Sequence, residues 1–240
     1  MSARRRARRS SPFYIPSAFG LFTPSKDLFL KHIDVFGLLY IIPALLWLHS
    51  WISTPTHGLN LWSRSSDANY SWTFPGSFNA ALIGFSILWF IFAIIVGLMV
   101  QIMLQKSQLD VVSTKKPDIG RAWQTAKKMW RPMIGLYIVM VLIFLAGLIL
   151  LLIPGLFMIR RYIFAPYVML EKKCGIKQAL EESHQLGLTN TGAVWGLIGV
   201  MFLISLVGVL PLIGSLASFV VGALYSIAPA LRYEQLKKLV

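Results

Sequence analysis

Runs of apolar residues long enough to cross a bilayer constrain the fold of this chain more than any other feature. A transmembrane helix needs about 20 mostly apolar residues. Six stretches reach or approach that length: Ile33–Ile52, Asn79–Leu104, Met133–Ile153, Gly155–Leu170, Ala193–Leu210 and Leu212–Leu231. Only 13% of the residues are charged, whereas soluble domains average about 25%. We therefore expect an all-α, polytopic membrane protein with six transmembrane helices.

The spans leave little chain for any other domain. Residues 1–24 are predicted to be a basic cytoplasmic tail, which contains the cluster Arg4–Arg9. Residues 25–240 are predicted to form a single transmembrane domain. No soluble domain fits between the apolar stretches.

The distribution of positive charge predicts the orientation in the membrane. With the N-terminus inside, the inner segments hold 20 of the 23 Lys and Arg residues. Cytoplasmic loops carry such an excess of Lys and Arg. Both termini of this multi-pass protein are therefore predicted on the cytoplasmic side of the cell membrane. The net charge of +14 indicates contact with anionic lipid of that leaflet rather than with nucleic acid, because no nucleic-acid-binding module accompanies the basic cluster.

One amphipathic pattern occurs twice. The segment Ile119–Trp130 recurs in outline 57 residues later as Ile176–Gly187. Apolar or small residues occupy matching positions, namely Ile119, Ala122, Trp123, Ala126, Met129 and Trp130, then Ile176, Ala179, Leu180, Ser183, Leu186 and Gly187. Each copy precedes an apolar run that ends at a proline, Pro154 or Pro211. We expect a repeated unit made of an interfacial helix and a transmembrane hairpin. A fainter third copy would begin at Ser25, as the cap of a short helix.

The two copies differ on their polar faces. In the first, Asp118 is predicted to cap the helix and Pro132 to end it, so that the helix lies flat on an anionic leaflet. The candidate lipid contacts on this helix are Arg121, Trp123, Lys127, Lys128 and Trp130. The second copy carries Glu181 and Glu182 on its polar face, and we expect it to pack against protein.

A longer run supports the same architecture by resemblance. It combines a Pro154-Gly155 turn, the segment Ala165–Val168, the acidic Glu171 and an Ala179-Leu180 helix with Ser183. With these elements, residues 110–235 resemble the membrane domain attached to some bacterial glycerophosphodiester phosphodiesterases and related free-standing membrane proteins. The resemblance implies a six-helix membrane fold. It implies no catalytic site, because the phosphodiesterase activity of that family resides in a separate soluble domain.

Two arginines inside the fourth predicted span are the candidate site for an anionic headgroup or substrate. Arg160 and Arg161 follow Gly155 by five and six residues, about 8–9 Å along a helix. At that depth either side chain is expected to reach the outer surface by extending along the helix. Ionisable residues in a span are rare and commonly functional. The alternative is that they anchor the helix at the interface.

Signals for catalysis are absent from the sequence. His32 with Asp34 at a span end favours a solvated helix start over a proton site. Glu181, Glu182 and His184 share an exposed face, which is typical of a solvated cluster. No spacing matches a metal site or a phosphate-binding glycine motif, so we predict no catalytic residue, cofactor or metal ligand.

Two functions remain open from the sequence. The first is a non-catalytic membrane protein that binds lipid or organises a membrane-protein partner, with a homo-oligomer as a further option. The alternative is a small transporter or channel subunit for an anionic or lipid-like substrate, with a cavity between the repeats reached past Arg160 or Arg161.

Overall fold

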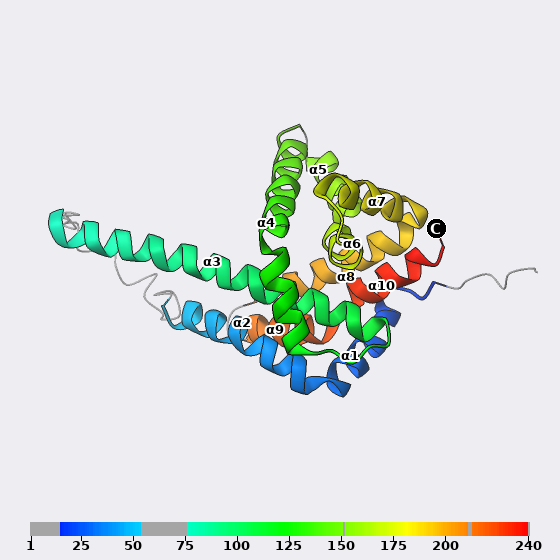
Figure 1. The fold of residues 1–240 in the computed structure, drawn as a ribbon, viewed down its shortest axis with the longest axis horizontal. Coiled ribbons are helices and arrows are strands. Elements are labelled where there is room, and N and C mark those ends of the chain that lie inside the picture. Colours follow the sequence, from blue (N-terminus) through cyan, green and yellow to red (C-terminus); the bar gives the residue numbers. More distant parts are fainter. Residues whose placement is uncertain (1–14, 54–75, 151, 211–212, 240) are drawn as a thin grey trace, which may run out of the picture. The chain divides into compact units, whose positions relative to one another are not determined.

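Helices make up every regular element that the structure describes. This computed structural model describes residues 15–53, 76–150, 152–210 and 213–239 (Figure 1). The elements in these ranges are η1 (Phe19–Leu21), α1 (Phe22–Lys31), α2 (Ile33–Ser53), α3 (Gly76–Val112), α4 (Ile119–Leu150), α5 (Leu152–Tyr162), α6 (Ala165–Lys172), α7 (Ile176–Thr189), α8 (Thr191–Val207), α9 (Ile213–Tyr225) and α10 (Ala228–Lys237). The all-α prediction is confirmed for this part of the chain. Arg4–Arg9 and most of the long loop before α3 lie outside it.

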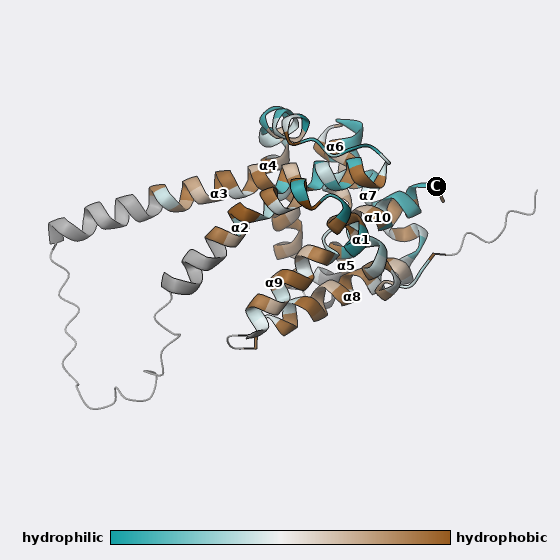
Figure 2. Ribbon diagram, turned by 90° about the horizontal axis from the view of Figure 1, so that it is seen from below, coloured by the Kyte–Doolittle hydropathy of each residue, from teal (hydrophilic) through white to brown (hydrophobic). Residues whose placement is uncertain are grey.

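Several of these helices are apolar enough to cross a membrane. Three segments meet the requirements of length and hydropathy, or up to five if each of two broken helix pairs counts as one span. The three are Leu88–Val112, Ile119–Ile149 and Gly214–Lys237. Figure 2 shows hydrophobic residues concentrated along α8 and α9. These helices indicate a membrane protein, and the count of six spans stays a prediction.

The chain forms two compact units. One unit joins Met1–Lys31 to Ile138–Val240, and the other is His32–Tyr137. In the first unit α7 packs against α5 and α6, and α8 packs against α9. Helix α1 packs against α9 and α10, so helices from early and late in the sequence belong to the same unit.

Helix α4 corrects the prediction that Pro132 ends an interfacial helix. The helix continues through Pro132 from Ile119 to Leu150. A buried stripe runs along one side at spacings of three and four residues, and it consists of Ala122, Ala126, Met129, Met133 and Leu136. The stripe keeps its phase across the proline, so packing holds both halves in one helix despite the lost backbone hydrogen bond.

Short turns divide the helix of the fourth predicted span and that of the sixth, although most of the sixth still lies within the single apolar segment Gly214–Lys237. α5 ends at Tyr162 and α6 begins at Ala165, with Pro166 in its first turn. α9 ends at Tyr225 and α10 begins at Ala228, also with a proline in the first turn. Proline lacks an N–H and disfavours helical geometry in the residue before it, whereas it is tolerated in a first turn. Each Ala-Pro pair therefore starts a new helix.

The segment before α2 is part of the fold. α1 begins at Phe22, so Ser25 is not its N-cap. Instead Ser25 is fully buried, and its hydroxyl donates to the Leu224 carbonyl at 2.6 Å. The Tyr225 hydroxyl donates to the Ala18 carbonyl at 2.9 Å. Part of the segment predicted as a tail is thus fastened to α9.

The second unit buries a polar helix end. α2 packs against α3, whose 37 residues extend eight residues past the predicted span end at Leu104. The Gln105 amide donates to the Tyr137 hydroxyl at 3.0 Å. The Lys106 ammonium pairs with the buried Asp110 carboxylate at 2.6 Å. Because these polar side chains have partners, α3 continues through the polar residues that follow Leu104.

Candidate functional site

Arg160 lies in the last turn of α5 with only 7% of its surface exposed. Its Nη1 donates to the Thr191 hydroxyl of α8 at 3.3 Å. The guanidinium carbon lies 5.4 Å from the centre of the Phe157 ring. Its Nε is buried and has no hydrogen-bond partner among the described residues. Arg160 is therefore a buried cation with an incomplete set of contacts.

Helix α7 creates this position by close contact with α5. A side chain at Gly187 would place its Cβ 2.7 Å from the Arg160 carbonyl oxygen, so glycine is required for the approach. The Ser183 hydroxyl donates to the Arg161 carbonyl at 2.8 Å. Small residues on the second repeated helix therefore serve contact with protein, as the sequence predicted for that helix.

A sharp bend then brings α8 to the arginine. α7 and α8 meet at an angle of 101°, with the break at Asn190. The Asn190 side chain accepts a hydrogen bond from the Ala193 N–H at 3.1 Å and so caps α8. Thr191 is the first residue of α8, so its hydroxyl meets Arg160 at the N-terminal end of that helix.

The electrostatics of this corner favour an anion. A helix N-terminus carries partial positive charge, and Arg160 adds a full charge beside it. Within the part of the chain that the structure describes, no carboxylate forms an ion pair with Arg160. A group with acceptor oxygens would meet the guanidinium and the helix terminus together.

The structure places Arg160 at the opposite end of α5 from Gly155. There its side chain contacts the α7–α8 corner. α5 ends two residues later, at Tyr162. The predicted depth of Arg160 in the membrane stays a prediction. Arg161 is half-buried, and its Nε also lacks a partner among the described residues.

An apolar surface borders the corner. The Phe157 ring is 42% exposed and meets the Trp195 ring edge-on, with the ring centres 5.6 Å apart. In a membrane protein an exposed aromatic ring beside a cation suits the level of the lipid headgroups.

A second polar cluster joins α6, α7 and α10. Glu171 accepts hydrogen bonds from the Tyr233 hydroxyl and the Lys237 ammonium. Burial alone would raise the pKa of Glu171, but these hydrogen bonds hold it below its ordinary value. A cavity of about 350 Å³ adjoins the cluster, lined by Lys172, Glu182, Gln185, Leu186, Tyr233 and Lys237.

The charges in this cluster are mutually paired. Lys172 pairs with Glu182, which also accepts from the Gln178 amide at 3.1 Å. These contacts therefore connect α6 to α7 and α10. The sequence assigned Glu182 to a solvated or paired face, and it indicated no role for Tyr233 or Lys237, because nothing in a single sequence marks contacts across more than 60 residues.

The predicted lipid contacts lie on the first part of α4. Arg121, Trp123, Lys127 and Lys128 are exposed, and Trp130 is half-buried. The sequence grouped both tryptophans with the apolar face. Trp123 is instead 44% exposed, and the Lys127 ammonium lies 5.5 Å from its ring centre. These residues therefore form a basic, aromatic surface on a continuous helix.

No protein-family model, curated protein or solved structure matches the chain. Among the described residues, no group of three or more His, Cys, Asp or Glu side chains could hold a metal ion. The helices indicate an all-helical membrane protein, and the Arg160 corner is the best candidate site among the described residues.

Proposed function

We propose that this chain is a multi-pass membrane protein that binds an anionic lipid headgroup at Arg160. The observation that carries the proposal is the burial of Arg160 without a carboxylate partner among the described residues. Removing a charge from water costs several kcal/mol of desolvation free energy, and a compensating charge recovers part of it. A phosphate at the start of α8 would supply that charge.

The surroundings favour a lipid phosphate over a freely dissolved anion. Phe157 is exposed beside the guanidinium, and α8 continues from the corner as an apolar helix. A phospholipid would place its phosphate at Arg160 and its chains against these residues. The basic surface of Arg121, Lys127 and Lys128 on α4 also suits an anionic leaflet.

The number of spans, their orientation and the repeated unit are part of this proposal. Six spans with both termini cytoplasmic would put α7 at the inner interface, and the distribution of Lys and Arg supports that orientation. The Ala-Pro start of both α6 and α10 supports a repeated unit, because the same break follows an apolar helix twice. The resemblance to phosphodiesterase-associated membrane domains agrees with a non-catalytic role.

Native mass spectrometry of the detergent-extracted protein tests the headgroup site. The wild type is expected to retain phosphatidylglycerol in preference to phosphatidylcholine. Arg160→Gln is expected to lower retention of phosphatidylglycerol about tenfold, equivalent to about 1.4 kcal/mol, and to leave phosphatidylcholine retention unchanged.

Lys238→Gln is the matched control, because it removes the same charge from an exposed residue just after α10. Equal phosphatidylglycerol retention by Arg160→Gln and Lys238→Gln would exclude the site. Inorganic phosphate added in millimolar excess distinguishes the source of the anion. Displacement of the lipid by phosphate would show that the corner binds free anions rather than lipid specifically.

The transport alternative predicts a cavity reached past Arg160 or Arg161. Neither arginine lines the cavity beside Glu171. Transport therefore stays a prediction, which flux of a labelled anion into proteoliposomes would test.

A further inference from the structure

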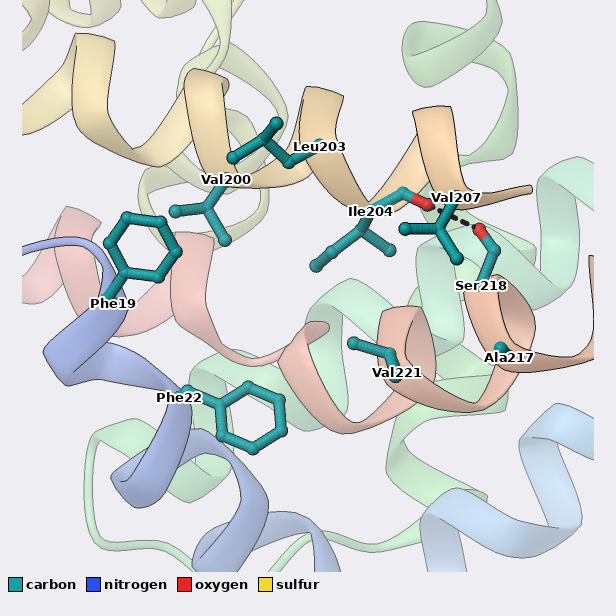
Figure 3. Close-up of a pocket in the computed structure, with 9 residues that line it drawn as sticks. All are labelled: Phe19, Phe22, Val200, Leu203, Ile204, Val207, Ala217, Ser218 and Val221. Atoms are coloured by element: carbon teal, nitrogen blue, oxygen red, sulfur yellow. Dashed lines mark hydrogen bonds between the residues drawn. The ribbon is translucent and has the colours of Figure 1, made fainter. Parts of the chain in front are cut away.

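An apolar groove of about 220 Å³ runs between η1–α1, α8 and α9 (Figure 3). It is lined by Phe19, Phe22, Val200, Leu203, Ile204, Val207, Ala217, Ser218 and Val221. The two phenylalanines stand at one end, and Val207 with Ser218 stands at the other. All of these residues belong to one compact unit of the chain.

Close contact between α8 and α9 near one end, and small side chains beyond it, shape the groove. A side chain at Gly214 would place its Cβ 2.3 Å from the Val207 carbonyl oxygen, so the helices meet there. Away from that contact, the small side chains of Ala217 and Ser218 leave space that larger residues would fill. At the opposite end the Phe22 ring stacks on Tyr225, with the ring centres 6.5 Å apart.

The groove has no polar group to offer a ligand. Its one polar side chain, Ser218, donates its hydroxyl to the Ile204 carbonyl at 2.8 Å, as Figure 3 shows. A sugar, a headgroup or a polar peptide placed here would lose hydrogen bonds to water without replacement. The chemistry of the lining therefore selects hydrocarbon.

The size of the groove selects a single thin chain. From Val200 to Val207 its length along α8 is about 10 Å at the helical rise per residue. A helix with its side chains is about 10–12 Å across, so a partner helix would not enter a space of about 220 Å³.

The rim of the groove continues the surface that faces lipid. Leu203, Val207 and Val221 line the groove and are still 49%, 42% and 36% exposed. Beside them on α8, Phe202 and Leu206 are 65% and 53% exposed. In a membrane protein such apolar surface lies against acyl chains, and the groove opens directly onto it.

We propose that this groove holds one acyl chain of a membrane lipid. The site is separate from the Arg160 corner. Thr191, which contacts Arg160, and Val200 are nine residues apart on α8, about two and a half turns, so they point to opposite sides of the helix. A hydrocarbon chain in the groove would contact η1 and α1 as well as α8 and α9.

Photolabelling in a neutral bilayer tests the proposal. The protein is reconstituted in phosphatidylcholine with a trace of phosphatidylcholine that carries a diazirine on one acyl chain. After illumination, labelled residues are located by mass spectrometry. Ile204 and Ala217 are expected to be labelled more strongly than Phe202 and Leu216, which lie on the open surface.

Filling the groove supplies the second measurement. Ala217→Phe is expected to lower labelling of Ile204 about tenfold, equivalent to about 1.4 kcal/mol. Leu216→Phe is the matched control, because it adds a ring to the neighbouring residue, which is 53% exposed, and should leave the labelling unchanged. If Ala217→Phe does not fold, Val221→Phe narrows the groove from its partly exposed rim.

Three outcomes would overturn the proposal. One is equal labelling of Ile204, Phe202 and Leu216, which indicates only the general lipid surface. Another is unchanged Ile204 labelling in the filled variants. The third is cross-linking of Ile204 to a second copy of the chain in place of labelling by lipid, which would identify the occupant as protein. Arg160→Gln should leave the labelling unchanged in this neutral bilayer, so the two proposed sites fail or succeed separately.

Discussion

Arg232 in α10 donates from Nη2 to the carbonyl oxygen of Pro16 at 2.9 Å, across 216 residues of sequence. Arg232 is fully buried, and its Nη1 donates to the Gln235 side chain at 3.1 Å. Together with the contact between Tyr225 and Ala18, this bond fastens the segment before α1 to the C-terminal helices. The buried Arg232 guanidinium thus holds the residues just before α1 against α10.

Replacing this arginine should destabilise the protein and release the segment. Arg232→Gln leaves the Pro16 carbonyl without its charged donor, and we expect a loss of about 2 kcal/mol in the free energy of unfolding. Thermal unfolding in detergent measures the loss, and limited proteolysis should show new cleavage near residues 15–21. Lys238→Gln, at an exposed residue just after α10, is the control. Identical melting and cleavage of the two variants would contradict the prediction.

The contact between α5 and α7 should not tolerate a methyl group. In Gly187→Ala the new Cβ would lie 2.7 Å from the Arg160 carbonyl oxygen. We expect a loss of about 1–3 kcal/mol from overpacking. Gly199→Ala in α8 is the control, because nothing lies within 4 Å of its added Cβ, and there the helix should gain up to about 1 kcal/mol. Chemical denaturation of both variants in mixed micelles compares them. A shift of the denaturation midpoint in the same direction for both variants would contradict the prediction.

The Glu171 cluster should make stability depend on pH. Hydrogen bonds from Lys237 and Tyr233 hold the pKa of Glu171 below its ordinary value of 4.5. A carboxyl with a lowered folded-state pKa stabilises the fold above its ordinary pKa, and that contribution is lost as the pH falls through the folded pKa. The melting temperature should therefore drop below about pH 4.5, and Glu171→Gln should reduce this drop. Glu181→Gln, at an exposed residue of α7, is the control. Unaltered pH dependence in Glu171→Gln would refute the prediction.

The single cysteine reports on orientation. Cys174 lies between α6 and α7, and burial raises the pKa of its thiol above the ordinary value of 9.0. Because the thiolate reacts, maleimide labelling should be slow at neutral pH and accelerate as the medium becomes alkaline. With both termini cytoplasmic, an impermeant maleimide should label inside-out vesicles and spare right-side-out vesicles. The opposite pattern would reverse the orientation.

Local signals in the sequence predicted several helix boundaries correctly. Asp118 accepts a hydrogen bond from the Gly120 N–H at 3.0 Å, so α4 begins where a capping residue precedes the periodic pattern. α7 begins at Ile176, where the second amphipathic segment was predicted to begin. α2 begins at Ile33, the predicted start of the first span. Such boundaries depend on neighbouring residues, which a single sequence contains.

Tertiary packing decided the features that the sequence did not predict. Pro132 reads as a helix end in isolation, yet the buried stripe from Ala122 to Leu136 carries α4 through it. The sequence marked Arg160 as a candidate anion contact but did not reveal its neighbours, which the close approach of Gly187 and the hydrogen bond to Thr191 bring to it. Both outcomes depend on surfaces formed by distant parts of the chain.

The length of α3 has a mechanical consequence. Its 37 residues span about 55 Å, whereas the hydrocarbon layer is about 30 Å thick. Gln105 and Asp110 lie buried near one end of the helix, and both have partners within the protein. A spanning helix longer than the hydrocarbon layer adjusts by tilting, at a modest cost in free energy. As a spanning helix, α3 is therefore expected to tolerate membranes of different thickness.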